Sequence, residues 1–311
     1  PIEAARANGF AIDPTLKPHA PLQPGRHVFD GWDLHDLRQY IDWTPFFRAW
    51  ELAGNYPAIL DDAIVGESAR SLWADAQAML DTIVAERWLT ARGVAALWPA
   101  RREGDDVVVT GEDGEVRLPF LRQQIAKREG RANMCLADFV TGHDDWIGGF
   151  AVGIHGIEPH IARFKAAHDD YHDILLKALA DRLAEAFAEA LHRHVRTTLW
   201  GYAPDEQLTN EALIREQYRG IRPAPGYPAC PDHSEKPMLF DLLRAGEATG
   251  ITLTDSFAML PTAAVSGFYF GHPQAEYFGV ARIGPDQVAD YAARRGVEVA
   301  QAERWLRPNL D

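Results

Sequence analysis

The sequence predicts an α+β fold, in which a twisted, mostly antiparallel sheet packs against long helices. Strand-like and helix-like hydrophobic patterns follow one another irregularly along the 311 residues, without the regular alternation of a parallel α/β fold. Residues 159–199 add a long amphipathic stretch. The chain contains neither the G-x-G-x-x-G turn of a Rossmann-type fold nor a G-x-x-x-x-G-K-[ST] loop. We therefore expect no nucleotide site of either kind.

The N-terminal segment differs in composition from the rest of the chain. It shows no hydrophobic periodicity and is interrupted by Pro14, Pro18, Pro21 and Pro24. We expect residues 1–30 to form an extended arm or linker, and residues 31–311 to form a single domain. The chain begins without an initiator methionine or a signal pattern, so both a piece cut from a longer chain and a stand-alone subunit stay open as interpretations.

Helices and strands are both predicted in the first half of the chain. Residues 34–40 have the pattern of a short helix, and residues 61–85 carry apolar side chains at helical spacing. Runs of β-branched and other apolar residues, separated by polar turns, predict strands. The predicted strands of this half are residues 93–99, 106–110, 135–140 and 146–152.

Residues 159–199 predict one long amphipathic helix, or two helices joined by a kink. Apolar side chains recur every four residues, Pro159 suits a first helical turn, and Gly201 lies just beyond the end. The opposite face carries charged residues such as Glu189, which we expect to be solvated. His192 is also expected on the surface.

The second half continues with a helix predicted over residues 208–219, capped by Thr209 or Asn210. A proline-rich segment follows it directly. The other predicted elements are helices at 236–247, 286–295 and 299–306 and strands at 256–259, 264–270 and 277–283.

The proline-rich segment, residues 221–233, reads I-R-P-A-P-G-Y-P-A-C-P-D-H. Proline fixes φ and lacks an N–H donor, so this segment should be a stiff, extended loop. Such a loop loses little entropy when it binds a ligand. Arg222 offers a planar fork for a carboxylate, Gly226 permits close approach to the backbone, and Tyr227 supplies a flat face with a polar tip. A rigid crossover between two elements is an equally good interpretation.

The composition is that of an ordinary globular protein, with 47% hydrophobic and 24% charged residues. The formal net charge of -14 argues against binding to nucleic acid or to anionic lipid. No apolar run is long enough to span a bilayer. Cys135 and Cys230 form no disulfide framework, so a reducing cytoplasm is the expected location.

The residues with metal-ligand chemistry make no convincing site. His168 and His172 are four apart and would share one helix face, but no third ligand is visible nearby. Cys230 and His233 bring too few ligands. We expect no metal, and a metal-dependent enzyme that uses the two histidines is the least favoured hypothesis.

Asp42 has two interpretations that the residues alone leave open. It precedes Thr44 and Pro45, which suit the start of a helix, so its carboxylate could cap that helix. It could equally face the amine of a ligand.

Several sequence blocks occur in the order found in one known family. They include Y-I-D-W-T-P-F-F (40–47), A-G-N-Y-P-A-I-L (53–60), W-G-Y-A-P (200–204), G-I-R-P-A-P-G-Y-P-A-C-P (220–231) and V-S-G-F-Y-F-G-H-P (265–273). The chain resembles the C-terminal activation domain of cobalamin-dependent methionine synthase over essentially its whole length. It lacks the homocysteine zinc site, the folate domain and the D-x-H-x-x-G motif of that enzyme.

The resemblance implies a fold unlike the common Rossmann-type methyltransferase fold. It also implies that the chain binds S-adenosylmethionine and presents the methyl group for reductive methylation of inactive cob(II)alamin. Cobalamin would be carried by a partner domain or subunit, and flavodoxin or a similar reductase would supply the electron. The chain would then be part of a methyltransferase and inactive without its partner. The alternative is a docking or sensor module that binds the same ligand or a cobalamin protein without catalysis.

The resemblance also implies a set of site residues. Arg222 matches the arginine for the ligand carboxylate, Asp42 the acid for its polar end, and the backbone from Ala224 to Gly226 the support for adenosine. The remaining matched positions are Tyr277, Phe278 (often tyrosine in the family), the corrin-facing Tyr227, and the acidic Glu185 and Glu216. No catalytic residue is expected, because no proton moves in the methyl transfer and placement should suffice.

Overall fold

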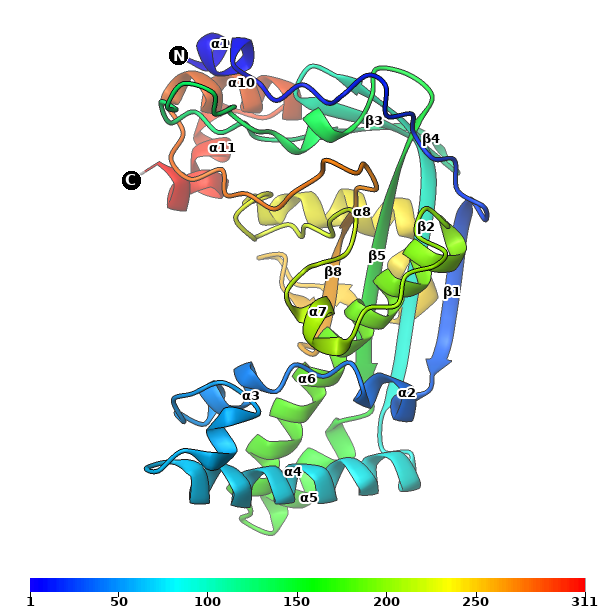
Figure 1. Cartoon of the computed structure of the whole chain (residues 1–311), viewed down its shortest axis with the longest axis vertical. Helices are drawn as coiled ribbons and strands as arrows, with labels where there is room; N and C mark the ends of the chain where they lie inside the picture. Colours follow the sequence, from blue (N-terminus) through cyan, green and yellow to red (C-terminus); the bar gives the residue numbers. More distant parts are fainter. Residues whose placement is uncertain (311) are drawn as a thin grey trace.

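The computed structural model describes residues 1–310, and in them six antiparallel strands form one sheet flanked by helices (Figure 1). The strand order is β4-β3-β2-β5-β8, and β1 also pairs with β2. This confirms the predicted α+β class. The strands are β1 (Gly25–Trp32), β2 (Thr90–Glu103), β3 (Asp106–Gly111), β4 (Gly114–Pro119), β5 (Asp145–His155) and β8 (Ala264–Tyr269), with a separate pair β6 (Thr252–Leu253) and β7 (Met259–Leu260).

Strand β2 is central to the sheet, because one of its edges pairs with two different strands in succession. Its first half pairs with β1, with Leu97 opposite Gly25, and its last residues pair with β3, with Ala100 opposite Val109. On its other side it pairs with the whole of β5. Alternate residues of β5 enter two different cores. Phe150 packs among side chains of α4 (Gly66–Glu86) and α6 (Asp170–His194), and Ala151 enters the core that includes side chains of α8 (Lys236–Leu243).

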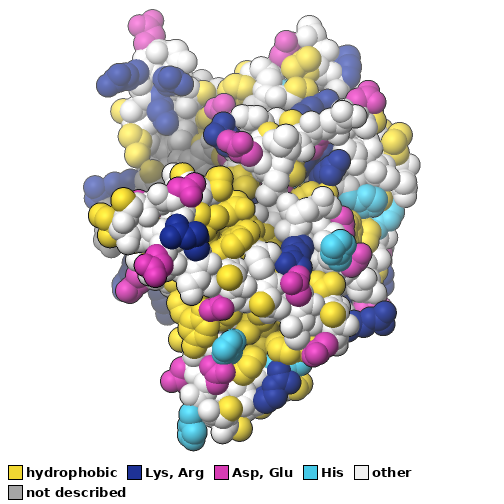
Figure 2. All heavy atoms as spheres, turned by 60° about the horizontal axis from the view of Figure 1, so that its bottom comes forward, with side chains coloured by type: hydrophobic (Ala, Val, Ile, Leu, Met, Phe, Trp, Pro, Cys, Tyr) yellow, Lys and Arg dark blue, Asp and Glu magenta, His cyan; other side chains and the backbone are white. Residues whose placement is uncertain are grey.

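The helices cover both faces of this sheet and both ends of the molecule. In Figure 1, α3, α4 and α5 lie at the lower end, and α1, α10 and α11 lie at the upper end. Figure 2 brings the lower end forward and shows hydrophobic side chains gathered there among scattered acidic and basic ones. The helices are α1 (Ile2–Ala7), α2 (Leu34–Arg38), α3 (Thr44–Ala49), α4 (Gly66–Glu86), α5 (Glu158–Ala166), α6 (Asp170–His194), α7 (Asn210–Ile214), α8 (Lys236–Leu243), α9 (Ala245–Thr249), α10 (Pro285–Arg295) and α11 (Val299–Leu306).

The long amphipathic stretch forms two helices, which was the second of the two predicted possibilities. Helix α5 ends before His168, whose φ of 54° reverses the chain, and Asp169 then caps α6 by accepting the His172 N–H at 3.1 Å. His168 therefore lies outside α6, and the helical spacing that made it a candidate metal partner of His172 does not hold. Helix α6 runs on into a short π-helical turn, Val195–Leu199.

Two of the predicted strands are wrong. Residues 135–140 contain a 3₁₀ turn, Leu136–Phe139, because the buried Asp138 carboxylate accepts the Cys135 N–H at 2.9 Å and closes the turn. Residues 277–283 form no strand, and Ala281 within them takes a left-handed φ of 59°. Their hydrogen bonds go to separate loops: the Val280 N–H donates to the carbonyl of Pro228, and the Ile283 N–H to a carbonyl near the C-terminus.

Other predicted elements are shorter than expected. The predicted strand at 256–259 keeps only Met259, because Phe257 takes a left-handed φ of 68°. The predicted helix at 208–219 ends at Ile214, and Glu216 is left-handed with φ of 57°. Left-handed backbone interrupts both strand and helix geometry, and these residue types give no sequence signal for it.

The expected N-terminal arm is also shorter. Residues 1–30 include α1 and most of β1, so that only residues 8–24 lack a helix or strand. A six-residue helix and an edge strand with no clear alternation are weak sequence signals. A domain boundary at residue 30 stays a prediction.

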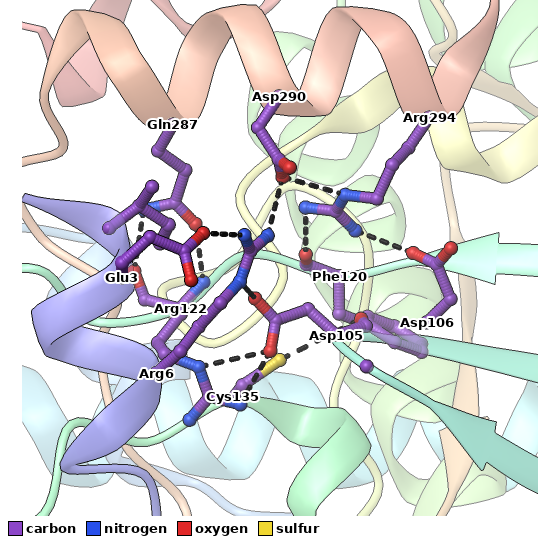
Figure 3. Close-up of polar contacts among 12 residues, drawn as sticks. Glu3, Arg6, Asp105, Asp106, Phe120, Arg122, Cys135, Gln287, Asp290 and Arg294 are labelled. Carbon is purple, nitrogen blue, oxygen red and sulfur yellow. Dashed lines mark hydrogen bonds and ion pairs between the residues drawn. The ribbon is translucent and has the colours of Figure 1, made fainter.

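A buried network of charged side chains ties α1 and α10 to the sheet (Figure 3). Arg122 is the centre of the network, with its guanidinium 2.6 Å from Asp105 and 2.7 Å from Asp138. All three side chains are at most 1% exposed. Arg6 of α1 reaches Asp105 at 2.9 Å and Asp290 of α10 at 2.7 Å. The two terminal segments of the chain are thereby joined to these buried ion pairs through the partly exposed pair of Arg6 and Asp290.

Within residues 1–310, no helix combines the length and the apolar character that a membrane span requires. Cys135 and Cys230 are both free thiols in the interior.

Candidate functional site

The proline-rich segment, residues 221–233, is a loop, as its composition predicts, and its first residues lie along β8. It is not extended throughout, because the Tyr227 N–H donates to the Ala224 carbonyl and the Cys230 N–H to the Tyr227 carbonyl, which closes two turns. Ile221 and Phe270 exchange two backbone hydrogen bonds of 3.0 Å, and the Phe268 N–H donates to the Pro223 carbonyl at 2.8 Å. Gly267 of β8 allows this approach, since a side-chain carbon there would lie 2.7 Å from the Pro223 oxygen. The sheet therefore holds the backbone of the loop in place.

Two adjoining hollows lie between this loop and helix α6. The first has a volume of about 310 Å³ and is bounded by the loop from Arg222 to Ala229, by Val265 of β8 and by Tyr277 and Phe278. The second, of about 270 Å³, lies between α6, α7 and the start of α3. Arg222, Glu185 and Glu216 border both hollows. A ligand with an apolar end and a charged end would fit this pair of hollows, with Arg222 at their junction.

Arg222 is held from two sides. Its guanidinium lies 3.1 Å from a carboxylate oxygen of Glu189 on α6, and its backbone N–H donates to the Tyr277 hydroxyl at 3.0 Å. Burial alone would lower the pKa of Arg222, but the nearby Glu189 charge raises the pKa above its usual value. The Nε–H group is buried and has no partner among the described residues. Arg222 is thus a fixed cation with unused hydrogen-bonding capacity.

A pair of tyrosines supports the backbone of Arg222. The hydroxyl groups of Tyr277 and Tyr218 lie 2.8 Å apart, and Tyr218 packs edge-on against His192 with ring centres 4.7 Å apart. Burial raises the pKa of both tyrosines, so their hydroxyl groups stay neutral at physiological pH. Tyr277 is a predicted site residue, whereas the sequence analysis missed Tyr218.

Asp42 borders the second hollow, and it also contacts the helix that follows it. One of its carboxylate oxygens accepts the Thr44 N–H at 3.2 Å at the start of α3. The two interpretations of Asp42 are therefore compatible, because a carboxylate has more than one acceptor position.

The other predicted residues divide into those that border the first hollow and one that does not. Ala224, Tyr227, Phe278, Glu185 and Glu216 all border it. Tyr227 is 62% exposed. Partial burial raises the pKa of Glu216.

Gly226 borders neither hollow. Its N–H donates to the Cys230 carbonyl at 2.7 Å, and its φ is 93°. A side-chain carbon at this position would lie 2.1 Å from the His233 ring. The absence of a side chain at Gly226 makes room for that ring. A close approach of a ligand to the Gly226 backbone stays a prediction.

Sequence reasoning missed Glu189 and misplaced His192. Both were expected on the surface, but Glu189 is 7% exposed and His192 is fully buried. Glu189 follows Glu185 by one helical turn on α6, so it borders the same hollow. This i, i+4 spacing was the one signal that could have identified it. His192 stacks on Tyr269 with ring centres 5.2 Å apart, and burial lowers the pKa of the imidazole, which is neutral.

A buried acidic cluster anchors the far end of the loop. Cys230 donates its S–H to Glu235 at 3.1 Å, and the Tyr291 hydroxyl of α10 contacts both Asp232 and Glu235. Arg295 pairs with Asp232 at 2.8 Å. Burial, with the neighbouring charge of Asp232, raises the pKa of Glu235 to about 8.

This cluster should make the protein less stable as the pH rises. The ordinary pKa of Glu235 is 4.5, so between about pH 4.5 and 8 the folded state binds a proton that the unfolded state has lost. Its contribution to the free energy of unfolding falls by at most about 1.4 kcal/mol per pH unit across this range. Glu235→Gln, a mimic of the protonated form, should remove that slope. Urea unfolding at pH 5, 6.5 and 8 measures how the free energy of unfolding depends on pH. The control is Glu303→Gln, at an exposed position. If the wild type and both variants show the same pH dependence, the raised pKa of Glu235 is contradicted.

Among residues 1–310, no three His, Cys, Asp or Glu side chains are grouped so as to hold a metal ion. The two hollows instead bring together one fixed arginine, four carboxylates and an apolar loop.

Comparisons with known proteins agree on one family. The family model described as "Vitamin B12 dependent methionine synthase, activation domain" matches residues 33–296, a range that includes every predicted site residue. A crystal structure of the MetH reactivation domain bound to AdoHcy is similar to this chain, with a TM-score of 0.95 and 51% sequence identity. The similarity covers 100% of this chain and 98% of that one.

Proposed function

Because this chain belongs to the family of vitamin B12 dependent methionine synthase activation domains, we propose that it binds S-adenosylmethionine and presents the methyl group for reductive methylation of inactive cob(II)alamin. The observation that carries the proposal is the position of Arg222, at the junction of an apolar hollow and an acidic one. S-adenosylmethionine has the matching form, with a nucleoside at one end and a zwitterionic amino acid at the other.

In this proposal the first hollow holds the nucleoside of the ligand and the second hollow holds its amino-acid end. The adenosine lies against the loop from Ala224 to Ala229, with Tyr277 and Phe278 opposite. The ligand carboxylate pairs with Arg222, and its ammonium group faces Asp42 in the second hollow. Phe278 has no hydroxyl group, so it contributes apolar contact only. Gly226 contributes through the shape of the loop.

The chain's part in the chemistry is placement. The sulfonium C–S bond breaks as the methyl group passes to cobalt that has been reduced by one electron, and no proton is transferred. A rigid loop and a fixed arginine hold the sulfonium carbon in one position, which raises the effective concentration of the methyl group. Tyr227 is exposed beside the first hollow and is the residue we place against the corrin.

The partners follow from the same chemistry. Cobalamin arrives on a cobalamin-binding domain or subunit of methionine synthase, and flavodoxin or a similar reductase supplies the electron. The isolated chain is then expected to bind its ligand without turning it over. Two free buried thiols agree with a reducing compartment such as the cytoplasm.

Calorimetric titration with S-adenosylmethionine tests the first step. Mixing the complex with a cob(II)alamin-loaded partner and a reductant, and following the absorbance of methylcobalamin, tests the second. Saturable binding followed by methylcobalamin formation supports the proposal. Binding without methylcobalamin would favour the docking or sensor module, and turnover of small thiols or amines by the chain alone would refute the need for a partner.

A further inference from the structure

Glu189 is the one strongly buried carboxylate that borders the acidic hollow, and it is only partly paired. One of its oxygens, Oε2, lies 3.1 Å from Nη2 of Arg222. The other, Oε1, is buried and has no hydrogen-bond donor among residues 1–310. A buried carboxylate oxygen without a donor is costly, so this atom calls for a donor from outside the chain.

We propose that Glu189 binds the amino-acid end of the ligand, with Oε2 orienting the Arg222 guanidinium and Oε1 accepting a hydrogen bond from the ligand's ammonium group. This inference rests on the proposed function. Its motivation is the unpaired Oε1 atom, together with the place of Glu189 beside Asp42 on the border of one hollow.

The pairing of Glu189 with Arg222 leaves the arginine able to bind a second carboxylate. A guanidinium has five N–H donors, and the contact with Glu189 uses one of them. The Arg222 Nε–H is also buried and unpartnered among the described residues. Glu189 thus limits how the guanidinium can rotate, and it leaves donors free for the ligand.

The charge of the hollow favours a cationic group as the missing donor. Its border carries four carboxylates, those of Asp42, Glu185, Glu189 and Glu216, against the two guanidinium groups of Arg182 and Arg222. A ligand carboxylate entering this hollow alone would add negative charge to an acidic surface. A zwitterion brings an ammonium group with its carboxylate, and Glu189 lies next to the arginine that receives the carboxylate.

The test compares three ligands by calorimetry, in the wild-type chain and in Glu189→Gln. The ligands are S-adenosylmethionine, its analogue without the ammonium group, and 5′-methylthioadenosine, which lacks the whole amino-acid end. Glutamine keeps the shape of the side chain and an oxygen for Arg222, but it removes the charge. Glu211→Gln is the matched control, because Glu211 pairs with Arg215 on α7 with both side chains mostly exposed.

Glu189→Gln should weaken the binding of S-adenosylmethionine about 10- to 100-fold, the usual worth of a charged hydrogen bond. It should weaken the analogue without ammonium clearly less, and leave 5′-methylthioadenosine within about twofold, since that ligand does not reach the acidic hollow. Glu211→Gln should bind all three ligands as the wild type does.

The outcomes separate this inference from the proposal on which it rests. If the wild type binds no S-adenosylmethionine, both are wrong. If the wild type binds and Glu189→Gln binds equally well, only the inference fails. An equal loss of affinity for all three ligands would show that Glu189 only supports the fold of the site, and this outcome also overturns the inference. Should Glu189→Gln not fold, Glu189→Asp, which keeps the charge and moves it back, must show the same selective loss.

Discussion

Replacing Arg222 with alanine should weaken the binding of S-adenosylmethionine by about 2–5 kcal/mol and leave the chain folded. This corresponds to a loss of affinity of about 30- to 5,000-fold. Two effects contribute: the ligand carboxylate loses its partner, and Glu189 loses the guanidinium that lies 3.1 Å from it in the wild type. Calorimetric titration measures the loss, and far-ultraviolet circular dichroism checks the fold.

A second variant separates the two effects. Arg222→Ala combined with Glu189→Gln removes the unpaired carboxylate as well as the arginine, so its loss should be smaller than the sum of the two single losses. Arg215→Ala is the control, since Arg215 is an exposed arginine of the same neighbourhood whose side chain is 65% exposed. Unchanged affinity in Arg222→Ala would reject the assignment of the carboxylate site.

Replacing Arg122 with leucine should lower the free energy of unfolding by about 3–5 kcal/mol, because it leaves Asp105 and Asp138 buried with fewer partners. Such a loss is a large part of the stability of an ordinary domain. Urea unfolding at pH 7 measures it. Arg101→Leu is the control, because Arg101 pairs with Glu103 and Glu115 at the surface. In Arg101→Leu the free energy of unfolding should fall by no more than about 1 kcal/mol.

The effect of Arg122→Leu should shrink in acid. Burial would raise the pKa of Asp105, but Arg122 and Arg6 more than offset this and hold the pKa below its usual value. A carboxylate with a lowered pKa stabilises the fold above its ordinary pKa, and this contribution is lost as the pH falls. This loss falls below the ordinary pKa of 3.8. The free energies of unfolding at pH 7 and at about pH 2 should therefore differ less in the variant than in the wild type. An equal difference would mean that Arg122 does not set the charge state of Asp105.

Much of the fold could be predicted because periodicity is a local property of the chain. The apolar repeat of α4 and the valine and aromatic residues of β8 were both visible in the sequence. The predicted strand at 277–283 was wrong because strand formation needs a neighbour, which a local pattern does not reveal. The buried charges of Asp105, Arg122 and Asp138 were equally invisible, since they meet only when three separate segments fold together.

Part of the candidate site could be predicted from the sequence, and part could not. The residues of the proline-rich loop could be singled out by composition, and the family resemblance added Asp42 and Tyr277 from other segments. Glu189 was placed on a solvated face because helical spacing defines a face without saying what covers it. The loop and α7 cover this one, so a charge predicted to meet water meets Arg222 instead.

The pairing of the proline-rich loop with β8 has a consequence for solubility. Strand β8 ends the sheet, and its free backbone groups could pair with another chain. Ile221 and Pro223 occupy those groups at Phe270 and Phe268, and the prolines of the loop have no N–H donors with which to continue the sheet. The loop that binds the nucleoside in our proposal therefore also blocks edge-to-edge aggregation. Substitutions that loosen this loop would expose the unpaired edge of β8 as well as weaken ligand binding.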